Sequence, residues 1–331
     1  MNTKERMEFY TFLKENKNKA NIDFSSAIKY PQNIFRYRSI NTNSLSALLE
    51  NKLYFSSSNY FDDPFDTNIY VDINKIEELL GKYINENTFD IKKLLLELEK
   101  SGFIVHNQQI ENKNISLLDI KTKLQAFVEN IRNEIKKQAY SACFSESEFN
   151  ETLWLKYADN HKGFVVEYDI RQGEILCGKK EDCIKCINNF NVYLYPMIYT
   201  NEKHDATEFS KIYLLIKSME LLNLKGDLYY KLIRDFNDNF KFDRELISLV
   251  KKECHEYDLE WRIIGLLYKN ENKPIFKYWK PKSVTIGLRT RPEDKKLIKE
   301  ISLKAGIDRI YEIYIDENGD LNKREYKNNE V

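Results

Sequence analysis

The chain has 331 residues, which is more than a typical single domain and too few for several, so one elaborated domain or two closely packed ones is expected. Hydrophobic residues make up 42% and charged residues 31%, a balance that excludes wholesale disorder and a fibrous protein. Lys+Arg and Asp+Glu both number 52, so no global positive charge gathers nucleic acid, and any such contact must be local.

The N-terminal sequence and the cysteine content indicate a cytoplasmic protein. Residues 1–20 alternate charged and apolar positions without an uninterrupted apolar run, so we expect neither a signal peptide nor a membrane span. Cys183 and Cys186 have the spacing of a zinc or redox pair, but no second pair follows, so we expect no metal site. The odd number of cysteines argues against a disulfide framework; they are Cys143, Cys177, Cys183, Cys186 and Cys254.

The first half of the chain predicts a compact strand, helix, strand unit followed by a helical block. The bounds of these elements come from the apolar residues, which alternate with polar ones in a strand and recur every three to four residues in a helix. The predicted elements are a helix at 3–17, a strand at 33–38, a helix at 43–51 led by an asparagine cap, strands at 52–56 and 67–72, and helices at 75–85, 88–101 and 113–138.

The second half returns to strands and contains a second helical block. Its predicted elements are a strand at 138–145, a helix at 151–158, a strand at 163–168, an extended segment at 191–199, helices between 207 and 253, strands at 260–268, 274–278 and 282–288, a helix at 292–304 and a strand at 308–315. We expect an α+β fold with a helical segment at 1–30 and a single elaborated domain at 31–331, with helical insertions at about 73–138 and 207–253.

The common catalytic signatures are absent from the sequence. It contains no HExxH motif, no Walker loop, no GxGxxG turn and no GxSxG elbow. The usual metalloproteases, P-loop enzymes, dinucleotide folds and serine hydrolases are therefore not indicated.

A pair of arginines lies on the first predicted strand. Arg36 and Arg38 share one face and Tyr37 takes the other, because side chains alternate along a strand. Two guanidinium groups on one face are suited to hold a phosphate or a carboxylate. The segment equally fits surface arginines on an edge strand.

Aromatic residues and a histidine follow the strand at 138–145. Trp154, Tyr157 and His161 are suited to line a pocket and stack on a planar ligand, with the histidine titrating near neutral pH. The alternative is that the aromatic pair belongs to the core and that His161 satisfies carbonyl groups at a helix C-terminus.

Three charges stand at the start of a late apolar strand. Asp258, Glu260 and Arg262 alternate with aromatic and apolar residues, so the pattern predicts that they share one strand face. They form either a structural ion pair or a site carboxylate that its arginine neighbour keeps ionised.

These segments together resemble a widespread bacterial family, domain of unknown function 2971, from about residue 31 to residue 290. Asp62 and Asp258 differ from the family's usual Asn and Glu, so Glu260 is the carboxylate that fits the family pattern. The motifs are Phe35-Arg-Tyr-Arg38, Phe55-Ser-Ser57, Asp62-Asp-Pro-Phe65, Cys143-Phe-Ser145, Trp154 through Gly163, and Asp258-Leu-Glu-Trp-Arg262.

The basic first strand, the Phe-Ser-Ser strand and the late Glu also resemble the ADP-ribosyltransferase superfamily, which includes DNA-modifying toxins. This resemblance implies a split, mainly antiparallel sheet and NAD as substrate. It implies that Arg36 or Arg38 holds the NAD phosphates. It further implies that Ser56 or Ser57 lines the nicotinamide side and that Glu260 contacts the ribose.

We therefore expect an NAD-consuming, ADP-ribosyltransferase-like effector, a toxin or an anti-phage defence protein. Cleaving the bond between nicotinamide and ribose builds positive charge, which Glu260 would stabilise. The motifs leave open whether the ADP-ribose goes to a protein, to a nucleic acid or to water. Further contacts to NAD are expected from Tyr37, Trp154, Tyr157, His161 and Arg262.

Two other functions compete with this one. In a non-enzymatic binding module, Arg38, His161 and Arg262 would hold a nucleotide or another phosphorylated ligand. In a magnesium-dependent nuclease, carboxylates would bind the metal, although an Asp-Pro turn is more often a structural cap. The carboxylates in question are Asp62, Asp63, Asp66 and Glu260.

Overall fold

The computed structural model describes residues 1–16, 27–85, 117–171, 176–177, 194–240, 243–266 and 275–327, with Lys93, Glu97 and Lys100. The pair Cys183 and Cys186 lies outside these residues, as does most of the predicted helix at 88–101.

The described elements mostly follow the predicted order. The helices are α1 (Thr3–Asn16), α2 (Thr42–Leu49), α3 (Ile73–Asn85), α5 (Leu117–Gln138), α6 (Glu151–Lys156), α7 (Thr207–Leu221), α8 (Asp227–Asn239), α9 (Asp243–Leu249) and α10 (Pro292–Lys304), with short 3₁₀ helices η2 (Ser58–Tyr60) and η5 (Glu253–Asp258). The strands are β1 (Asn33–Arg38), β2 (Lys52–Ser57), β3 (Ile69–Tyr70), β4 (Ala139–Ser145), β5 (Phe164–Asp169), β6 (Leu176–Cys177), β7 (Leu194–Pro196), β8 (Ile198–Tyr199), β9 (His204–Asp205), β10 (Val250–Lys251), β11 (Glu260–Leu266), β12 (Ile275–Tyr278), β13 (Ser283–Ile286), β14 (Ile310–Ile315) and β15 (Leu321–Glu325).

The main sheet is assembled from distant parts of the chain. Its strand order is β15-β14-β13-β5-β1-β4-β2-β12-β6, with β11 beside β4 and β7 beside β11. Among the described pairs of this sheet, β13 and β14 are parallel and the others are antiparallel. The expected α+β fold with a mainly antiparallel sheet is therefore confirmed.

The sheet opens beside β4. One edge of β4 pairs with β11 along its whole length, with Glu260 opposite Ser145. The other edge is shared, because β1 pairs with it at Ser145 and β2 pairs with it at Ser141 and the preceding residue. No described strand pairs with this edge between those points. β1 and β2 therefore diverge and leave an opening beside Cys143.

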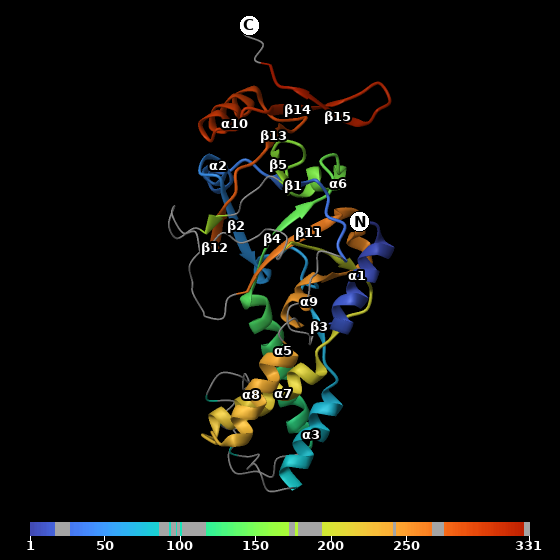
Figure 1. The fold of residues 1–331 in the computed structure, drawn as a ribbon, viewed down its shortest axis with the longest axis vertical. Coiled ribbons are helices and arrows are strands. Elements are labelled where there is room, and N and C mark those ends of the chain that lie inside the picture. The colour runs from blue at the N-terminus through green and yellow to red at the C-terminus, as the bar shows by residue number, and fades with distance from the viewer. Residues whose placement is uncertain are drawn as a thin grey trace.

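Separate hydrophobic cores support the sheet and the helical block. In the first, α1 buries Phe9 and Leu13 against a cluster that includes Trp261 of β11. In the second, Phe127 of α5 and Phe209 of α7 pack together. Figure 1 shows α3, α5, α7 and α8 grouped at one end of the molecule and α10, β14 and β15 at the other. Within the described parts of the chain, no helix has the length and apolar character needed to cross a bilayer.

The segment before β11 differs from its predicted structure. Residues 253–258 form η5, and Leu259 has left-handed backbone with φ 46°, so the strand begins only at Glu260. A left-handed residue breaks the alternation of side chains along a strand. The prediction that Asp258 shares a strand face with Glu260 and Arg262 is therefore wrong.

The start of α2 and the last strand also differ from prediction. α2 follows Asn41 rather than Asn43, and the Asn41 side chain accepts a hydrogen bond from the backbone N–H of Ser44 in a capping box. The sequence pattern misses β15 because its residues are mostly polar, and it pairs with β14 at the edge of the sheet.

A tight turn fixes the end of β1. Residues 159–161 all have left-handed backbone, with φ between 47° and 66°. Gly163 follows them, and a Cβ atom built there would lie 2.1 Å from the carbonyl oxygen of Arg38. Because only glycine permits this approach, the turn holds the end of the strand that carries the arginine pair.

We expect Gly163→Ala to destabilise the protein by about 1–3 kcal/mol, because the added methyl group overlaps backbone atoms. Gly226→Ala is the control, since a Cβ atom there meets no atom within 4 Å. Urea unfolding of both variants gives the difference in the free energy of unfolding. Equal stability of the two variants would contradict the close approach.

Candidate functional site

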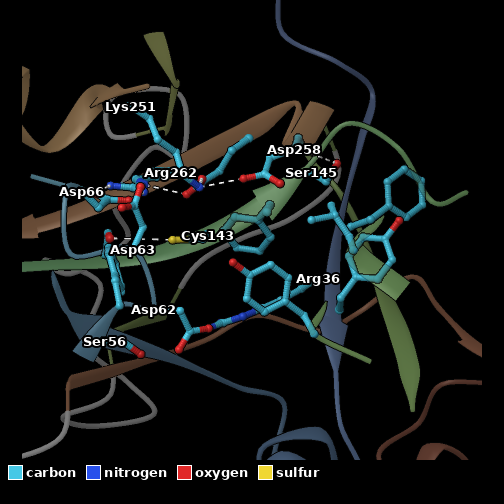
Figure 2. A pocket seen from close by; sticks show the side chains of 18 of the residues that line it. Arg36, Ser56, Asp62, Asp63, Asp66, Cys143, Ser145, Lys251, Asp258 and Arg262 are labelled. Atoms are coloured by element: carbon cyan, nitrogen blue, oxygen red, sulfur yellow. Dashed lines mark hydrogen bonds and ion pairs between the residues drawn. The ribbon is translucent and has the colours of Figure 1, made fainter. Parts of the chain in front are cut away.

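A cavity of about 300 Å³ lies at the opening between β1 and β2. Figure 2 shows charged and polar side chains from distant parts of the chain gathered around it. A second cavity, of about 780 Å³, adjoins it alongside α2, and both are lined by Arg36, Arg38, Ser56 and Tyr157. The charged residues of the first cavity are Arg36, Arg38, Asp62, Asp63, Asp66, Lys251, Asp258, Glu260 and Arg262.

Arg36 and Arg38 bring two positive charges to this cavity. Arg36 is buried, and its Nη2 donates to the carbonyl oxygen of Tyr54 at 2.8 Å. Burial and the charge of Arg36 lower the pKa of Arg38 to about 9, which leaves Arg38 charged at neutral pH. Neither guanidinium forms an ion pair with a carboxylate of the described chain. Two neighbouring guanidinium groups that form no ion pair with the described residues are suited to bind an anionic ligand.

The Glu260 carboxylate lines the same cavity and is held by two cations. Its Oε1 accepts from Arg262 Nε at 2.6 Å, and its Oε2 accepts from Lys251 Nζ at 3.0 Å. Burial alone would raise the pKa of Glu260, but the charges of Arg262 and Lys251 outweigh burial and hold the pKa well below its ordinary value. Glu260 is therefore ionised at neutral pH.

Arg262 is fully buried, and each of its nitrogens has an acceptor. Nη1 and Nη2 donate to the two carboxylate oxygens of Asp66 at 2.9 and 2.5 Å, and Nη1 also donates to the Ser248 carbonyl oxygen at 2.8 Å. Nε donates to Glu260. Such pairing is needed because removing one partner of a buried ion pair typically costs about 3–5 kcal/mol.

Lys251 joins Asp258 to this arrangement. Its Nζ donates to Asp258 Oδ2 at 2.7 Å as well as to Glu260. Burial raises the pKa of Asp258, although Lys251 opposes the shift, and Asp258 Oδ1 has no hydrogen-bond partner in the described structure. These five residues are called the buried ion-pair network; they are Asp66, Arg262, Glu260, Lys251 and Asp258.

Cys143 lies in the cavity wall as a protonated thiol. Burial and the negative charge of Glu260 raise the pKa of Cys143 to about 12. The thiolate is the reactive form of cysteine, so Cys143 is not suited to act as a nucleophile at neutral pH. Cys143 and Cys254 are both free.

Several predicted site residues meet at this cavity. The Tyr37 ring, however, packs edge to face on Trp154, and its hydroxyl donates to the Ser147 carbonyl oxygen at 2.8 Å. That ring is therefore committed to the core rather than to a ligand. The predicted residues that line the cavity are Arg36, Tyr37, Arg38, Ser56, Tyr157, Glu260 and Arg262.

Ser57 does not line the cavity. It is buried, and its hydroxyl donates to the Lys136 carbonyl oxygen at 2.9 Å. The Ser57 hydroxyl oxygen also accepts from the backbone N–H of Asn59 at the start of η2. Of the two serines in the motif, Ser56 is the one at the cavity, because neighbouring residues of a strand point to opposite faces.

Trp154 and His161 also lie outside the cavity. Trp154 is fully buried, and the His161 ring stacks on it with centroids 5.7 Å apart. Burial lowers the pKa of His161, so its ring is neutral at neutral pH. The expectation that these two rings stack on a ligand is not met, because they stack on each other. The alternative interpretation, a core tryptophan beside a turn, fits the structure.

Lys251 and the pairing of Asp66 are features of the site that sequence reasoning missed. Lys251 lies in the two-residue strand β10, inside a segment whose pattern predicts helix, and belongs to no motif. Asp66 directly follows the Asp62-Asp-Pro-Phe65 motif, so its position was a signal. No sequence pattern indicates that Asp66 pairs with Arg262.

Three of the four carboxylates considered as magnesium ligands, Asp63, Asp66 and Glu260, are engaged by basic side chains. Asp66 pairs with Arg262, and Asp63 Oδ2 lies 3.2 Å from His255 Nε2. In the described part of the chain, no group of three or more histidine, cysteine, aspartate or glutamate side chains is placed to hold a metal ion. The geometry therefore gives the nuclease interpretation no support.

A family model described as a protein of unknown function (DUF2971) matches residues 153–263. The resemblance predicted from the motifs is confirmed over this segment, which contains Tyr157, Glu260 and Arg262, whereas β1 and β2 lie outside it. No curated protein and no solved structure matches the chain.

The lowered pKa of Glu260 predicts a specific sensitivity to acid. Ionised Glu260 contributes stability that is fully present above the ordinary value of 4.5 and is lost as the pH falls toward the folded-state pKa. Glu260→Gln lacks this contribution, so we expect its free energy of unfolding to fall less steeply below pH 4.5 than that of the wild type. Urea unfolding at a series of pH values measures both slopes. Parallel slopes would contradict the assignment.

Proposed function

We propose that the cavity binds NAD and cleaves the bond between nicotinamide and ribose, as an ADP-ribosyltransferase does. One observation carries the proposal. Two guanidinium groups without a carboxylate partner among the described residues share a cavity with an ionised glutamate. A ligand with both phosphates and a reacting ribose calls for both kinds of group at once.

The arginine pair suits the pyrophosphate of such a ligand. Guanidinium donors match phosphate oxygens in geometry, and Arg36 and Arg38 line both cavities. A ligand held at its phosphates could therefore place one nucleoside in each cavity. Tyr157 lines both as well, and its side chain, 40% exposed, offers a ring for stacking.

The proposed reaction builds positive charge on the ribose carbon C1′. As the bond from C1′ to the nicotinamide nitrogen breaks, its electron pair leaves with nicotinamide and the ribose becomes oxocarbenium-like. A fixed carboxylate stabilises that charge, and two donors hold Glu260 in place. Water or an acceptor group then forms the new bond to C1′ and releases a proton.

The strand arrangement supports the same proposal. β1 with the arginine pair, β2 with Ser56 and β11 with Glu260 all pair with β4. The three elements that the ADP-ribosyltransferase resemblance implies therefore meet at one opening in the sheet. In this role the protein would act in the cytoplasm, as a toxin or in anti-phage defence, with a protein or a nucleic acid as acceptor.

A second candidate function is a module that binds a nucleotide or phosphorylated ligand without cleaving it. Both oxygens of Glu260 already accept hydrogen bonds from Arg262 and Lys251, as expected of a structural carboxylate. In this case the arginine pair binds the phosphate and the buried ion-pair network stabilises the fold. Turnover of NAD separates the two functions.

Glu260→Gln is expected to abolish nicotinamide release and to leave NAD affinity largely unchanged. Glutamine keeps the shape and one acceptor oxygen but removes the charge that the transition state needs, so the loss appears in kcat. Nicotinamide release, NAD binding and Tm are measured on the same preparations.

Two results would contradict this assignment. A Glu260→Gln variant that melts early but keeps its specific activity would make Glu260 structural. Wild-type protein that binds NAD and releases no nicotinamide, with any protein or nucleic acid acceptor, would favour the binding module.

Arg38→Gln is expected to lower the affinity for ADP-ribose by about 10–100-fold, because charge-assisted hydrogen bonds contribute about 1.5–3 kcal/mol. Nicotinamide riboside carries no phosphate, so its affinity should not change. Arg289→Gln is the control, since Arg289 is exposed and does not line either cavity. Calorimetric titration measures each affinity. Equal losses for both ligands, or in both variants, would contradict a phosphate site at Arg38.

A further inference from the structure

The turn after η2 forms one wall of the cavity and is fastened to β11. Asp66 of this turn binds both terminal nitrogens of Arg262, as Figure 2 shows, and the Phe61 ring centroid lies 5.0 Å from the guanidinium carbon. Lys136 Nζ donates to the carbonyl oxygen of Pro64 at 2.6 Å. The turn is therefore tied both to β11 and to the last turn of α5.

Two non-glycine residues with left-handed backbone flank the contact between the turn and β11. Thr67, with φ 54°, directly follows Asp66, and Leu259, with φ 46°, directly precedes Glu260. A β-branched residue rarely adopts this conformation, and it persists where the surrounding structure imposes it. Thr67 Oγ1 also lies 3.0 Å from Asp66 Oδ1. Asp66 and Glu260, the two carboxylates that bind the Arg262 guanidinium, are thus each next in sequence to a residue whose backbone conformation the surrounding structure imposes.

We infer that Asp66 is a positioning residue for Glu260, an inference that rests on the proposed function. A guanidinium is a planar, rigid fork. Because Asp66 takes Nη1 and Nη2, the plane of Arg262 is fixed and its remaining donor, Nε, meets Glu260 Oε1 at 2.6 Å. Lys251, which Asp258 holds, meets the other oxygen. The Glu260 carboxylate therefore binds two cations, Arg262 and Lys251. A second carboxylate holds each of these cations in place.

Asp66 also limits how far Arg262 neutralises Glu260. The buried ion-pair network contains three carboxylates and two cations, so the fully ionised network keeps one negative charge. Without Asp66, Arg262 would have Glu260 as its only carboxylate partner in the network and would be free to turn Nη1 and Nη2 toward it. Glu260 would then lose its orientation and part of the charge that it offers to the transition state.

Asp66→Asn tests the inference, because asparagine keeps the shape and removes the charge. We expect kcat for nicotinamide release to fall about 100-fold, the loss typical of a misplaced catalytic group, with KM for NAD unchanged. Glu167→Gln is the matched control, since Glu167 is a buried carboxylate that pairs with Lys282 at 2.8 Å outside the cavity. Both variants remove the charge of a buried, paired carboxylate, so a purely structural role of Asp66 predicts that kcat falls in each variant only in proportion to the loss of folded protein.

A second readout does not require turnover. Crystal structures of the variants show the position of the Glu260 carboxylate directly. We expect Glu260 Oε1 to leave Nε of Arg262 for Nη1 or Nη2 in Asp66→Asn, and to keep its 2.6 Å contact with Nε in Glu167→Gln. If the wild type releases no nicotinamide and the carboxylate still moves in Asp66→Asn, the proposed function fails and Asp66 still positions Glu260.

Arg262→Lys covers the case in which Asp66→Asn does not fold. Lysine keeps the charge, but one ammonium group cannot bind Asp66 as a fork and also hold Glu260 in the same place. The same displacement of the Glu260 carboxylate is therefore expected. The inference is overturned if the Glu260 position and the kcat of Asp66→Asn match those of Glu167→Gln, or if Arg262→Lys leaves the Glu260 carboxylate in its wild-type position.

Discussion

Arg262 carries a full positive charge where water does not reach it. A buried guanidinium is tolerated only when acceptors surround it, and three segments supply them to Arg262: Asp66 in the turn after η2, Ser248 in α9 and Glu260 on its own strand. The turn, α9 and the sheet therefore meet at one side chain. The same contacts lower the pKa of Glu260 and fix its orientation, so the stability of the fold and the proposed chemistry depend on the same atoms.

The opening of the sheet beside β4 explains why polar groups reach its centre. Where β1 and β2 diverge, Arg36, Arg38 and Ser56 face a cavity instead of a paired strand. Placing a buried and a half-buried guanidinium group together, with neither in an ion pair among the described residues, costs stability, and proteins keep such costs mainly at functional sites. The close approach of Gly163 to the carbonyl oxygen of Arg38 fixes the end of β1 that carries the arginine pair. The topology and the candidate anion site are thus linked through one strand.

Sequence patterns predicted the α+β fold, because hydrophobic periodicity is strong in elements such as α10. Seven of the ten site residues that they indicated line the cavity, because the arginine pair and Glu260 lie in strand motifs. The rest depends on tertiary contacts that no local pattern encodes. Leu259 is left-handed against its own preference, which takes Asp258 off the strand. Asp66 meets a partner 196 residues away. Trp154 packs on its own motif neighbour, and the spacing of aromatic residues does not distinguish a core contact from a ligand contact.

A crystal structure of the protein with bound ADP-ribose would show whether the arginine pair and the buried ion-pair network serve one ligand. We predict that the pyrophosphate oxygens lie about 3 Å from the guanidinium nitrogens of Arg36 and Arg38 and that a hydroxyl of the terminal ribose donates to Glu260. The contacts between Asp66 and Arg262 should remain as they are without ligand. ADP-ribose bound outside the cavity, or bound there with its phosphates away from both arginines, would contradict this account.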